Sequence, residues 1–399
     1  MGVLIRKYRG SFLFTGMAKL AIVLFLASLA SAFIDTVWAV YLEGFFHNES
    51  YVGLFSGFLS VLAFISFFFL VPLIEKSKKS VLYSSVLLLA ALRYILFALN
   101  RNLVIFIFLS IFLTIIVSIK ITTMGIIVKD KSNKKDLSRN EGVIYSFNNV
   151  AWLIGPLIVS LILLDFGHSV VFLSSALLLF LAFLLFKISR IKDDNVVKKV
   201  DTNVFKNFLE FFKSKDRVIS YLIGAGVTTW WALIYLYMPL FIIDHGLKEY
   251  WIGIFLFACA LPLILFEYPF SKMAGKYGPK KFFLIGYSIA TITSLIAFFI
   301  SSPYAVLGIL VFASVGFAML EPTSEAYFFD ILKNKKDENR FYGPYNTAIE
   351  TGLIFGKITP AILLFFLPFK YVFLLFTGFM FFFFIISLKT KNVAEAKKN

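Results

Sequence analysis

Apolar residues run along this chain in long blocks, and short polar segments separate the blocks. A helix needs about 20 predominantly apolar residues to cross the hydrocarbon core of a bilayer. Twelve blocks meet this requirement: residues 17–44, 51–73, 81–99, 102–128, 142–164, 168–188, 218–243, 250–271, 281–301, 303–329, 342–366 and 370–388. The pattern therefore predicts an all-α membrane protein with twelve transmembrane helices.

One polar segment, residues 189–216, is much longer than the others and leaves six blocks on each side. We expect an N-terminal six-helix bundle (1–188), a linker (189–216) and a C-terminal six-helix bundle (217–399). Four apolar residues in the linker share one helix face by their i, i+3, i+4, i+7 spacing: Phe205, Phe208, Leu209 and Phe212. They predict an amphipathic helix at the membrane surface, and a plain solvated linker is the alternative.

The composition supports a lipid environment. Hydrophobic residues make up 60% of the 399 residues and charged residues 16%, whereas soluble domains are about 45–50% apolar and about 25% charged. A soluble enzyme is excluded. The net charge of +16 is a property of nucleic-acid-binding proteins too, so the positions of the basic residues decide what it means.

Nearly all of the 39 Lys and Arg residues fall on one side of the predicted membrane, the side that holds both termini and the linker. The opposite side has only Arg101, Lys248 and Lys370, and Lys19, Arg93, Lys120 and Lys357 lie within spans. Basic residues accumulate in cytoplasmic loops. We therefore expect a multi-pass protein of the cell membrane with both termini in the cytoplasm, and no nucleic-acid partner.

The two halves of the chain repeat at an offset of 200 residues. Glu49, Tyr51, Gly53 and Phe55 align with Glu249, Trp251, Gly253 and Phe255. With one residue inserted, Gly142 and Gly155 align with Gly343 and Gly356, and Lys120 aligns with Glu321. Parallel repeats of six helices are typical of transporters whose halves rock about a site near the middle of the membrane.

This pattern resembles the major facilitator superfamily over nearly the whole chain. The family has a G-x-x-x-[DE]-[RK]-x-G-[RK]-[RK] motif between its second and third helices and a weaker copy between its eighth and ninth. The first copy keeps Glu75, Lys76 and Lys79, and the second keeps Lys276, Gly278 and Lys280. The resemblance implies a cytoplasmic gate held by charge pairing, with Asp130 and Asp330 as partners. Ordinary positive charge at the cytoplasmic face is the alternative.

The fifth predicted helix contains Gly155-Pro156, where antiporters of the family have G-P-x-x-G-G. This sequence reads GPLIVS and keeps only the first half of the signature. The resemblance implies an exporter of drugs or metabolites.

Among the ionisable residues inside predicted spans, six are candidates for transport or proton coupling: Asp35, Lys120, Glu321, Glu325, Glu350 and Lys357. Charges in a membrane span are costly and usually functional. The resemblance places helices 1, 4, 7 and 10 around a central cavity. Lys120 and Glu321 then predict an ion pair that closes the cytoplasmic gate, unless Lys120 snorkels to the surface. The sequence does not decide which face of the fourth helix lines the cavity.

Asp35 and Glu350 could each bind and release a proton, because burial changes the affinity of a carboxylate for protons. A static ion pair between Asp35 and Lys357 is the alternative. Arg93 is interpreted as an anchor at the membrane interface and Glu267 as a packing or gating residue. Four aromatic residues could line the cavity: Trp38, Trp230, Trp231 and Tyr235. Acidic and aromatic walls suit lipophilic cations, although many aromatic residues must face lipid.

No metal or other cofactor is expected. His47, His168 and His245 fall in predicted external loops, and the sequence contains no HExxH, GxSxG or Walker pattern. The sequence therefore predicts a monomeric secondary transporter, with proton-coupled export of an amphipathic or cationic compound as the leading interpretation. Uptake of a small metabolite or lysolipid, and a receptor or scaffold that does not transport, are the alternatives.

Overall fold

The computed structural model describes residues 16–131, 137–189, 204–332 and 334–391. Every regular element in these ranges is helical. The helices are α1 (Gly16–Phe46), α2 (Glu49–Lys76), α3 (Lys79–Leu99), α4 (Leu103–Lys131), α5 (Leu137–Asp165), α6 (His168–Ile188), α7 (Val204–Phe211), α8 (Lys215–Ala232), α9 (Met238–Asp244), α10 (Tyr250–Tyr277), α11 (Pro279–Phe299), α12 (Pro303–Asp330), α13 (Lys335–Leu364) and α14 (Lys370–Ser387). A π-helical turn, η2 (Leu233–Tyr237), joins α8 to α9.

Twelve helical spans in the described ranges are long and apolar enough to cross a membrane, with α8, η2 and α9 together making the seventh. This confirms the predicted fold class. Local sequence sets several helix ends. Asn48 caps α2 by accepting hydrogen bonds from the backbone of Ser50 and Tyr51. Prolines begin α11 and α12, where a missing backbone N–H costs nothing.

The seventh span is irregular in the middle. Pro239 lies in the first turn of α9, directly after η2. Proline has no backbone N–H and therefore cannot donate to the carbonyl one turn back. The π-helical turn accommodates this break, and such turns are frequent at functional sites.

The predicted amphipathic helix of the linker is present as α7. Phe205 and Leu209 are exposed, and Phe208 is half-buried. Phe212 lies just beyond the helix end. The preceding linker residues 190–203 lie outside the described residues.

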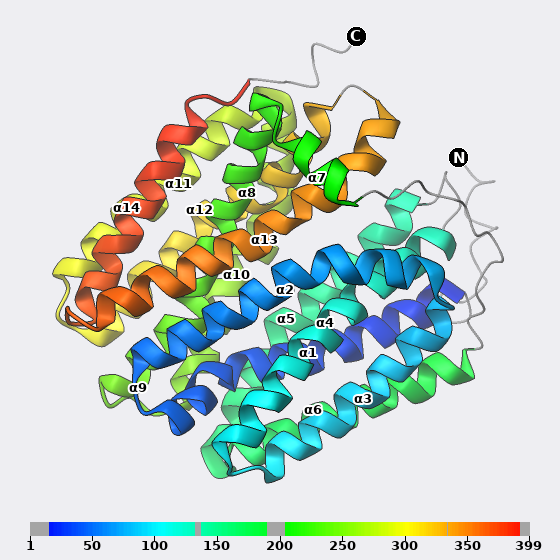
Figure 1. Ribbon diagram of the computed structural model, residues 1–399. Helices are drawn as coiled ribbons and strands as arrows, with labels where there is room; N and C mark the ends of the chain where they lie inside the picture. Colours follow the sequence, from blue (N-terminus) through cyan, green and yellow to red (C-terminus); the bar gives the residue numbers. More distant parts are fainter. Residues whose placement is uncertain (1–15, 132–136, 190–203, 333, 392–399) are drawn as a thin grey trace, which may run out of the picture.

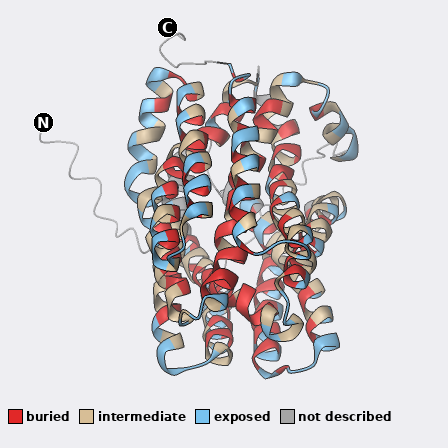
Figure 2. Cartoon of the chain, turned by 90° about the vertical axis from the view of Figure 1, so that its left-hand side faces the viewer, coloured by how far each residue is buried: buried red, intermediate tan, exposed pale blue. Residues whose placement is uncertain are grey.

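Helices of the same half pack closely together. α1 packs on α5 and α6, and α3 packs on α6 and α4. In the second half, α8 packs on α13 and α12, and α11 packs on α12 and α14. Buried residues concentrate where the helices meet, and exposed residues lie at the helix ends and on the outer faces (Figure 2).

Two helix pairs join the halves along their length, α2 with α13 and α5 with α10. Figure 1 shows α2 and α13, blue and orange, running beside one another. Small residues permit this close approach. A Cβ atom on Gly53 or Gly57 of α2 would overlap atoms of α13, and one on Gly253 of α10 would overlap the Pro156 carbonyl of α5. Gly53 and Gly253 occupy equivalent positions in the two repeats. Both allow close packing in the seam, which is the interface between the halves formed by α2 with α13 and by α5 with α10.

The structure corrects one detail of the repeat. α3 and α11, and likewise α4 and α12, begin 200 residues apart. Lys120 therefore corresponds to Leu320, which is fully buried, and not to Glu321. The inserted residue must come after these helices. Gly155 and Gly356 are equivalent as predicted, because their added Cβ atoms would meet Ala32 at 2.6 Å and Ala232 at 2.7 Å.

Candidate functional site

The α7 end is the end of the molecule at which α6 finishes, α7 lies and α8 begins; the opposite end holds the turn between α1 and α2. Asp35 on α1, which lies nearer the α1–α2 turn than the α7 end, is exposed, although its neighbours Ile34 and Thr36 are buried. α1 is an inner helix that packs on α5, α6 and α9. Asp35 therefore has accessible surface although it lies on an inner helix.

Asp35 lies on a stripe of α1 that repeats every three or four residues with Ser28, Ser31 and Trp38. Ser28 donates a hydrogen bond to the Asn148 side chain of α5 at 2.6 Å. Ser31 accepts a hydrogen bond from Nζ of Lys120 at 2.8 Å. The stripe is therefore the polar side of α1, and it faces groups on other helices.

The contacts of Lys120 show which face of α4 points toward α1. The side chain is buried, with 9% of its surface exposed, and it bonds Ser31 rather than snorkelling to a surface. The hydroxyls of Ser110, Thr114 and Ser118, on the other polar face of α4, each bond a backbone carbonyl one turn back. Those hydroxyls form their hydrogen bonds within α4 itself. The face that carries Lys120 is therefore the polar face that contacts another helix, α1.

Lys357 reaches across the seam between the halves. Its Nζ donates a hydrogen bond to Ser60 of α2 at 2.9 Å, and the Tyr237 hydroxyl bonds its backbone carbonyl. Lys357 interacts electrostatically with Glu350 on its own helix and with Asp35. Among the described residues, no ion pair joins Asp35 to Lys357 or Lys120, so the static pair considered for Asp35 is absent in this conformation.

The predicted Lys120–Glu321 pair is also absent in this conformation, since Lys120 bonds Ser31 instead. Glu321 on α12 has one buried carboxylate oxygen, Oε2, that finds no hydrogen-bond partner among the described residues. One turn along, Glu325 accepts a hydrogen bond from the Tyr342 hydroxyl at 2.9 Å. The acids of α12 thus form a group separate from the lysines.

The aromatic candidates divide into two groups. Tyr235 in η2 packs edge-on against Trp152 of α5, with ring centres 5.8 Å apart, and also contacts Trp231. Tyr235 interacts electrostatically with both Asp35 and Glu321. Trp230, by contrast, is fully buried and stacks on Phe317. Trp38 packs in an aromatic cluster with Phe97 and Phe106. Of the four candidates, Tyr235 therefore interacts with the charged groups, Trp231 packs against it, and Trp38 lies one turn from Asp35 on α1.

The motif residues occupy helix ends at the α7 end. Gly278 has a φ of 90° between α10 and α11, a conformation that favours glycine. Lys280 donates a hydrogen bond to the Leu388 carbonyl at the end of α14 at 2.7 Å. Lys276 lies over the Tyr277 ring, Lys79 begins α3 and Asp330 ends α12. The side chains of Glu75, Lys76 and Asp130 lie outside the described residues.

Gly155 and Pro156 occupy a three-helix junction. Gly155 lies against Ala32 of α1, and the Pro156 carbonyl lies against Gly253 of α10. Nearby, Ser160 donates a hydrogen bond to the Tyr250 carbonyl of α10 at 2.7 Å. This part of α5 therefore contacts its own half on one side and the other half on the opposite side.

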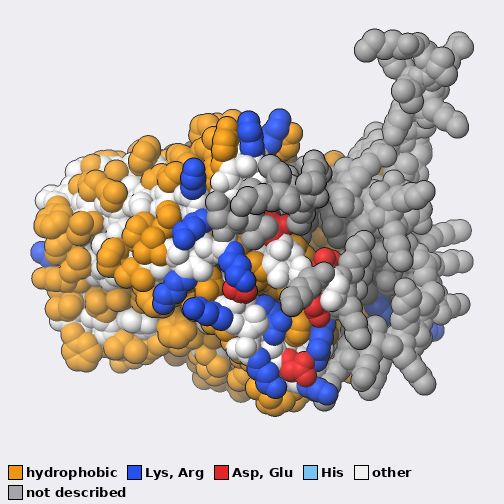
Figure 3. All heavy atoms as spheres, turned by 90° about the horizontal axis from the view of Figure 1, so that it is seen from above, with side chains coloured by type: hydrophobic (Ala, Val, Ile, Leu, Met, Phe, Trp, Pro, Cys, Tyr) orange, Lys and Arg blue, Asp and Glu red, His pale blue; other side chains and the backbone are white. Residues whose placement is uncertain are grey.

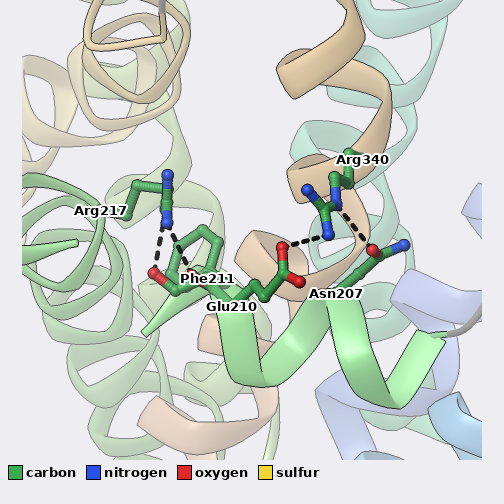
Figure 4. A network of polar contacts seen from close by, with 5 residues as sticks. All are labelled: Asn207, Glu210, Phe211, Arg217 and Arg340. Carbon is green, nitrogen blue, oxygen red and sulfur yellow. Dashed lines mark hydrogen bonds and ion pairs between the residues drawn. The ribbon is translucent and has the colours of Figure 1, made fainter. Parts of the chain in front are cut away.

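Polar contacts fix α7 to the second half (Figure 4). Arg340 of α13 forms an ion pair with Glu210 and donates to the Asn207 side chain. Arg217 of α8 donates to the backbone carbonyls of Glu210 and Phe211. On its other side, Phe208 packs against Phe64 and Phe68 of α2, with ring centres 6.0 and 5.0 Å apart. α7 thus touches both halves.

Sequence reasoning missed several of these contacts. Arg93 is not an interfacial anchor: only 1% of its surface is exposed, and it lies over the Tyr94 ring. His168 begins α6, and its Nε2 lies 3.0 Å from Oε2 of Glu249 in the other half. The hydrogen bond from His168 lowers the pKa of Glu249. Nothing in the sequence distinguishes this burial from a lipid-facing position, because the neighbours of Arg93 are apolar in either case.

No group of three or more His, Cys, Asp or Glu residues within the described part of the chain could hold a metal ion.

Comparison with known proteins identifies the family. The family model for the major facilitator superfamily matches residues 20–265 and 252–399. No curated protein matches the chain in sequence. The fold is similar to the nucleoside transporter NupG, with a TM-score of 0.75 and 14% identity over 94% of this chain and 100% of that one.

Two further structures are similar. One is a POT family transporter in complex with a thioalcohol-conjugated peptide, with a TM-score of 0.76, 14% identity and coverage of 94% and 95% of the two chains. The other is a bacterial homologue of the human lysosomal transporter Spinster, with a TM-score of 0.73, 12% identity and coverage of 94% and 96%. These likenesses establish the fold. Together with the family match, they show that the chain belongs to the major facilitator superfamily, whose members carry small molecules across membranes by alternating access.

Proposed function

We propose that this protein is a proton-coupled secondary transporter that exports a small amphipathic or cationic solute. The units 1–188 and 217–399 rock against each other in a monomer, and the solute and a proton compete for Asp35. The observation that carries the proposal is the state of this carboxylate: it is exposed within an inner helix and forms no ion pair with a described residue.

Competition at one carboxylate is the simplest basis for exchange. A carboxylate without a fixed cation can bind either a proton or a positive group of the solute, and each occupant excludes the other. The aromatic rings of Tyr235 and Trp231 nearby favour a solute with apolar and cationic parts. Glu321 and Glu350 are further candidates for carrying the proton.

We further propose that the α7 end is cytoplasmic and that the protein resides in the cell membrane. Basic residues in the described helices and just after α14 collect at this end, among them Lys272, Lys276, Lys280, Lys281, Lys389 and Lys391. Figure 3 shows Lys and Arg side chains gathered beside a broad apolar surface. The opposite end has Arg101, Lys248 and Lys370. This asymmetry matches the positive-inside rule.

The packing supports a site that opens toward the cytoplasm in this conformation. Away from the α7 end, α1 packs on α9 and η2, which closes that side. The main partners of α4 are α3 and α2, and those of α12 are α11, α10 and α8. α4 and α12, the helices that carry the predicted gate pair, thus pack mainly within their own halves. The direction of transport rests on Gly155-Pro156, the retained half of the antiporter signature.

Efflux measurements test the proposal. Cells expressing the protein are loaded with a panel of fluorescent amphipathic amines, and loss of each compound is followed with and without an uncoupler. Uncoupler-sensitive efflux that disappears in Asp35→Asn supports proton-coupled export. Accumulation in place of efflux would establish the uptake alternative, and compound movement identical to that of empty cells would favour the receptor or scaffold.

A further inference from the structure

Two lysines from opposite halves lie deep in the protein, and within the described part of the chain their ammonium groups have only serine hydrogen-bond partners. Lys120 of the first half bonds Ser31 at 2.8 Å, and Lys357 of the second half bonds Ser60 at 2.9 Å. Among the described residues, no carboxylate lies within ion-pair distance of either ammonium group. Both lysines interact electrostatically with Asp35, which therefore lies in the region between them.

Serine is a weak partner for a lysine in such a place. An ammonium group has three N–H donors, and a neutral hydroxyl satisfies one of them. Hydrogen bonds to a carboxylate are about twice as strong as those between neutral groups. An anionic group that enters the site can therefore stabilise each lysine, either by replacing its serine partner or by binding beside it.

Arg93 adds to the positive charge behind Lys120. Its guanidinium is 1% exposed, and none of its three nitrogens finds a hydrogen-bond acceptor among the described residues. Arg93 interacts electrostatically with Lys120. The region around α1, α3 and α4 thus holds two cations and one acid, Asp35. Since like charges repel strongly away from water, an anion bound at Lys120 would relieve this repulsion.

We propose that the transported solute is a zwitterion, whose anionic group binds between Lys120 and Lys357 while its ammonium group binds Asp35. This inference rests on the proposed function and narrows its amphipathic or cationic solute to one that carries both charges. A carboxylate is the simplest anionic group that accepts charge-assisted hydrogen bonds from lysine ammonium groups. A cation alone would leave both lysines with serine, and an anion alone would leave Asp35 without its partner.

The geometry also links binding to movement. Lys120 belongs to α4 of the first half and Lys357 to α13 of the second half. A carboxylate held by both lysines connects the two halves directly. Removing the carboxylate from a ligand should therefore weaken binding and also weaken the ability of the ligand to change the conformation.

Matched ligand pairs test the inference on the purified full-length protein. The probes are the free α-amino acids with apolar side chains and short dipeptides, each compared with its methyl ester, which keeps the ammonium group and lacks the carboxylate. Binding is measured by isothermal titration. Because charged hydrogen bonds are worth about 1.5–3 kcal/mol, at least one zwitterion should bind about 10- to 100-fold more tightly than its ester. Equal or tighter binding of the ester in every pair overturns the inference.

Variants show whether Lys120 and Lys357 cause the preference for the zwitterion over its ester. In Lys120→Gln and Lys357→Gln the difference between zwitterion and ester should shrink toward zero, and Lys357→Arg should retain most of it. Lys248→Gln, at an exposed position outside the site, is the control. A preference that survives both glutamine variants overturns the inference. The wild-type comparison alone decides the case if a variant fails to fold.

The result separates this inference from the proposed function. If esters bind as well as zwitterions and still displace protons, the zwitterion is wrong and proton exchange stands. If zwitterions bind preferentially without displacing a proton, the recognition of the carboxylate stands and proton coupling at Asp35 is wrong.

Discussion

Lys357 and Ser60 are 297 residues apart in the sequence, and the lysine Nζ donates a hydrogen bond to the serine hydroxyl at 2.9 Å. This contact crosses the seam between α13 and α2. It places a cation at the boundary that must shift when the halves rock. The tightest seam contacts elsewhere involve glycine, and they suggest the first prediction.

Gly253→Ala should destabilise the protein. The added methyl group would overlap the Pro156 carbonyl and the Ser160 hydroxyl, and the backbone of α5 cannot yield as a flexible side chain would. Overpacking of this kind costs about 1–3 kcal/mol, which thermal unfolding in detergent should detect as a lower Tm. Gly308→Ala is the matched control, because nothing lies within 4 Å of a Cβ atom there. An unchanged Tm for Gly253→Ala would show that the seam is loose.

Arg340→Ala should release α7 from the second half. The substitution removes the ion pair with Glu210 and the hydrogen bond to Asn207. A partly exposed pair of this kind is worth up to about 1 kcal/mol, so amide hydrogen exchange of residues 204–211 should become about fivefold faster. Lys213→Ala, an exposed position beside the helix, should leave the exchange rate unaltered. Equal exchange in the wild type and Arg340→Ala would assign the docking of α7 to its phenylalanines alone.

The contact between His168 and Glu249 should contribute to stability in a pH-dependent way. The hydrogen bond from His168 lowers the pKa of Glu249. The resulting stabilisation is present above the pKa of an unfolded glutamate, about 4.3, and is lost as pH falls through the lower folded value. Glu249 is 38% exposed, so the effect is at most about 1 kcal/mol.

Unfolding temperatures measured from pH 7 to pH 3 check this prediction. Glu249→Gln should be less stable than the wild type at pH 6, and the two curves should converge toward pH 3. Asp165→Asn, an exposed carboxylate at the same end, is the control. A difference that grows as the pH falls would have the wrong sign for this account.

The predicted gate pair of Lys120 and Glu321 should form in the conformation closed at the α7 end. Lys120→Glu or Glu321→Lys alone should weaken closure through like-charge repulsion, and the double variant should restore it. Cysteine cross-linking between α4 and α12 near the α7 end is the measurement, because Lys120 also has a proposed role in binding the solute. A double variant that cross-links as poorly as either single variant contradicts the pairing.

The sequence predicts the helices well because the bilayer imposes their length. The sixth span, expected at 168–188, coincides with α6, His168–Ile188. The rotation of each helix about its axis is a different matter. Lipid tails and the protein core are both apolar, so an apolar sequence does not distinguish the face that packs from the face that meets lipid. The face of α4 that carries Lys120 and the burial of Arg93 therefore emerge only from the structure.

Pairings between distant residues were equally out of reach of the sequence. Ser31 and Ser60 are ordinary hydroxyl residues within apolar spans, and nothing in their neighbourhood marks them as lysine partners. Glu249 was identified as a repeat mate of Glu49, but its contact with His168 depends on how α6 and α10 meet. The repeat itself was predicted from the sequence. The observed helix starts were needed to show that Leu320, and not Glu321, is equivalent to Lys120.

Proton release on ligand binding tests the central claim most directly. The purified protein is placed in weakly buffered solutions at a series of pH values from 7 down to 5 with a pH-indicator dye, and a solute found in the transport or binding assays is added. If solute and proton compete for Asp35, the wild type releases protons on binding, and Asp35→Asn releases none while Lys248→Gln releases as many as the wild type. Undiminished proton release from Asp35→Asn would contradict the account.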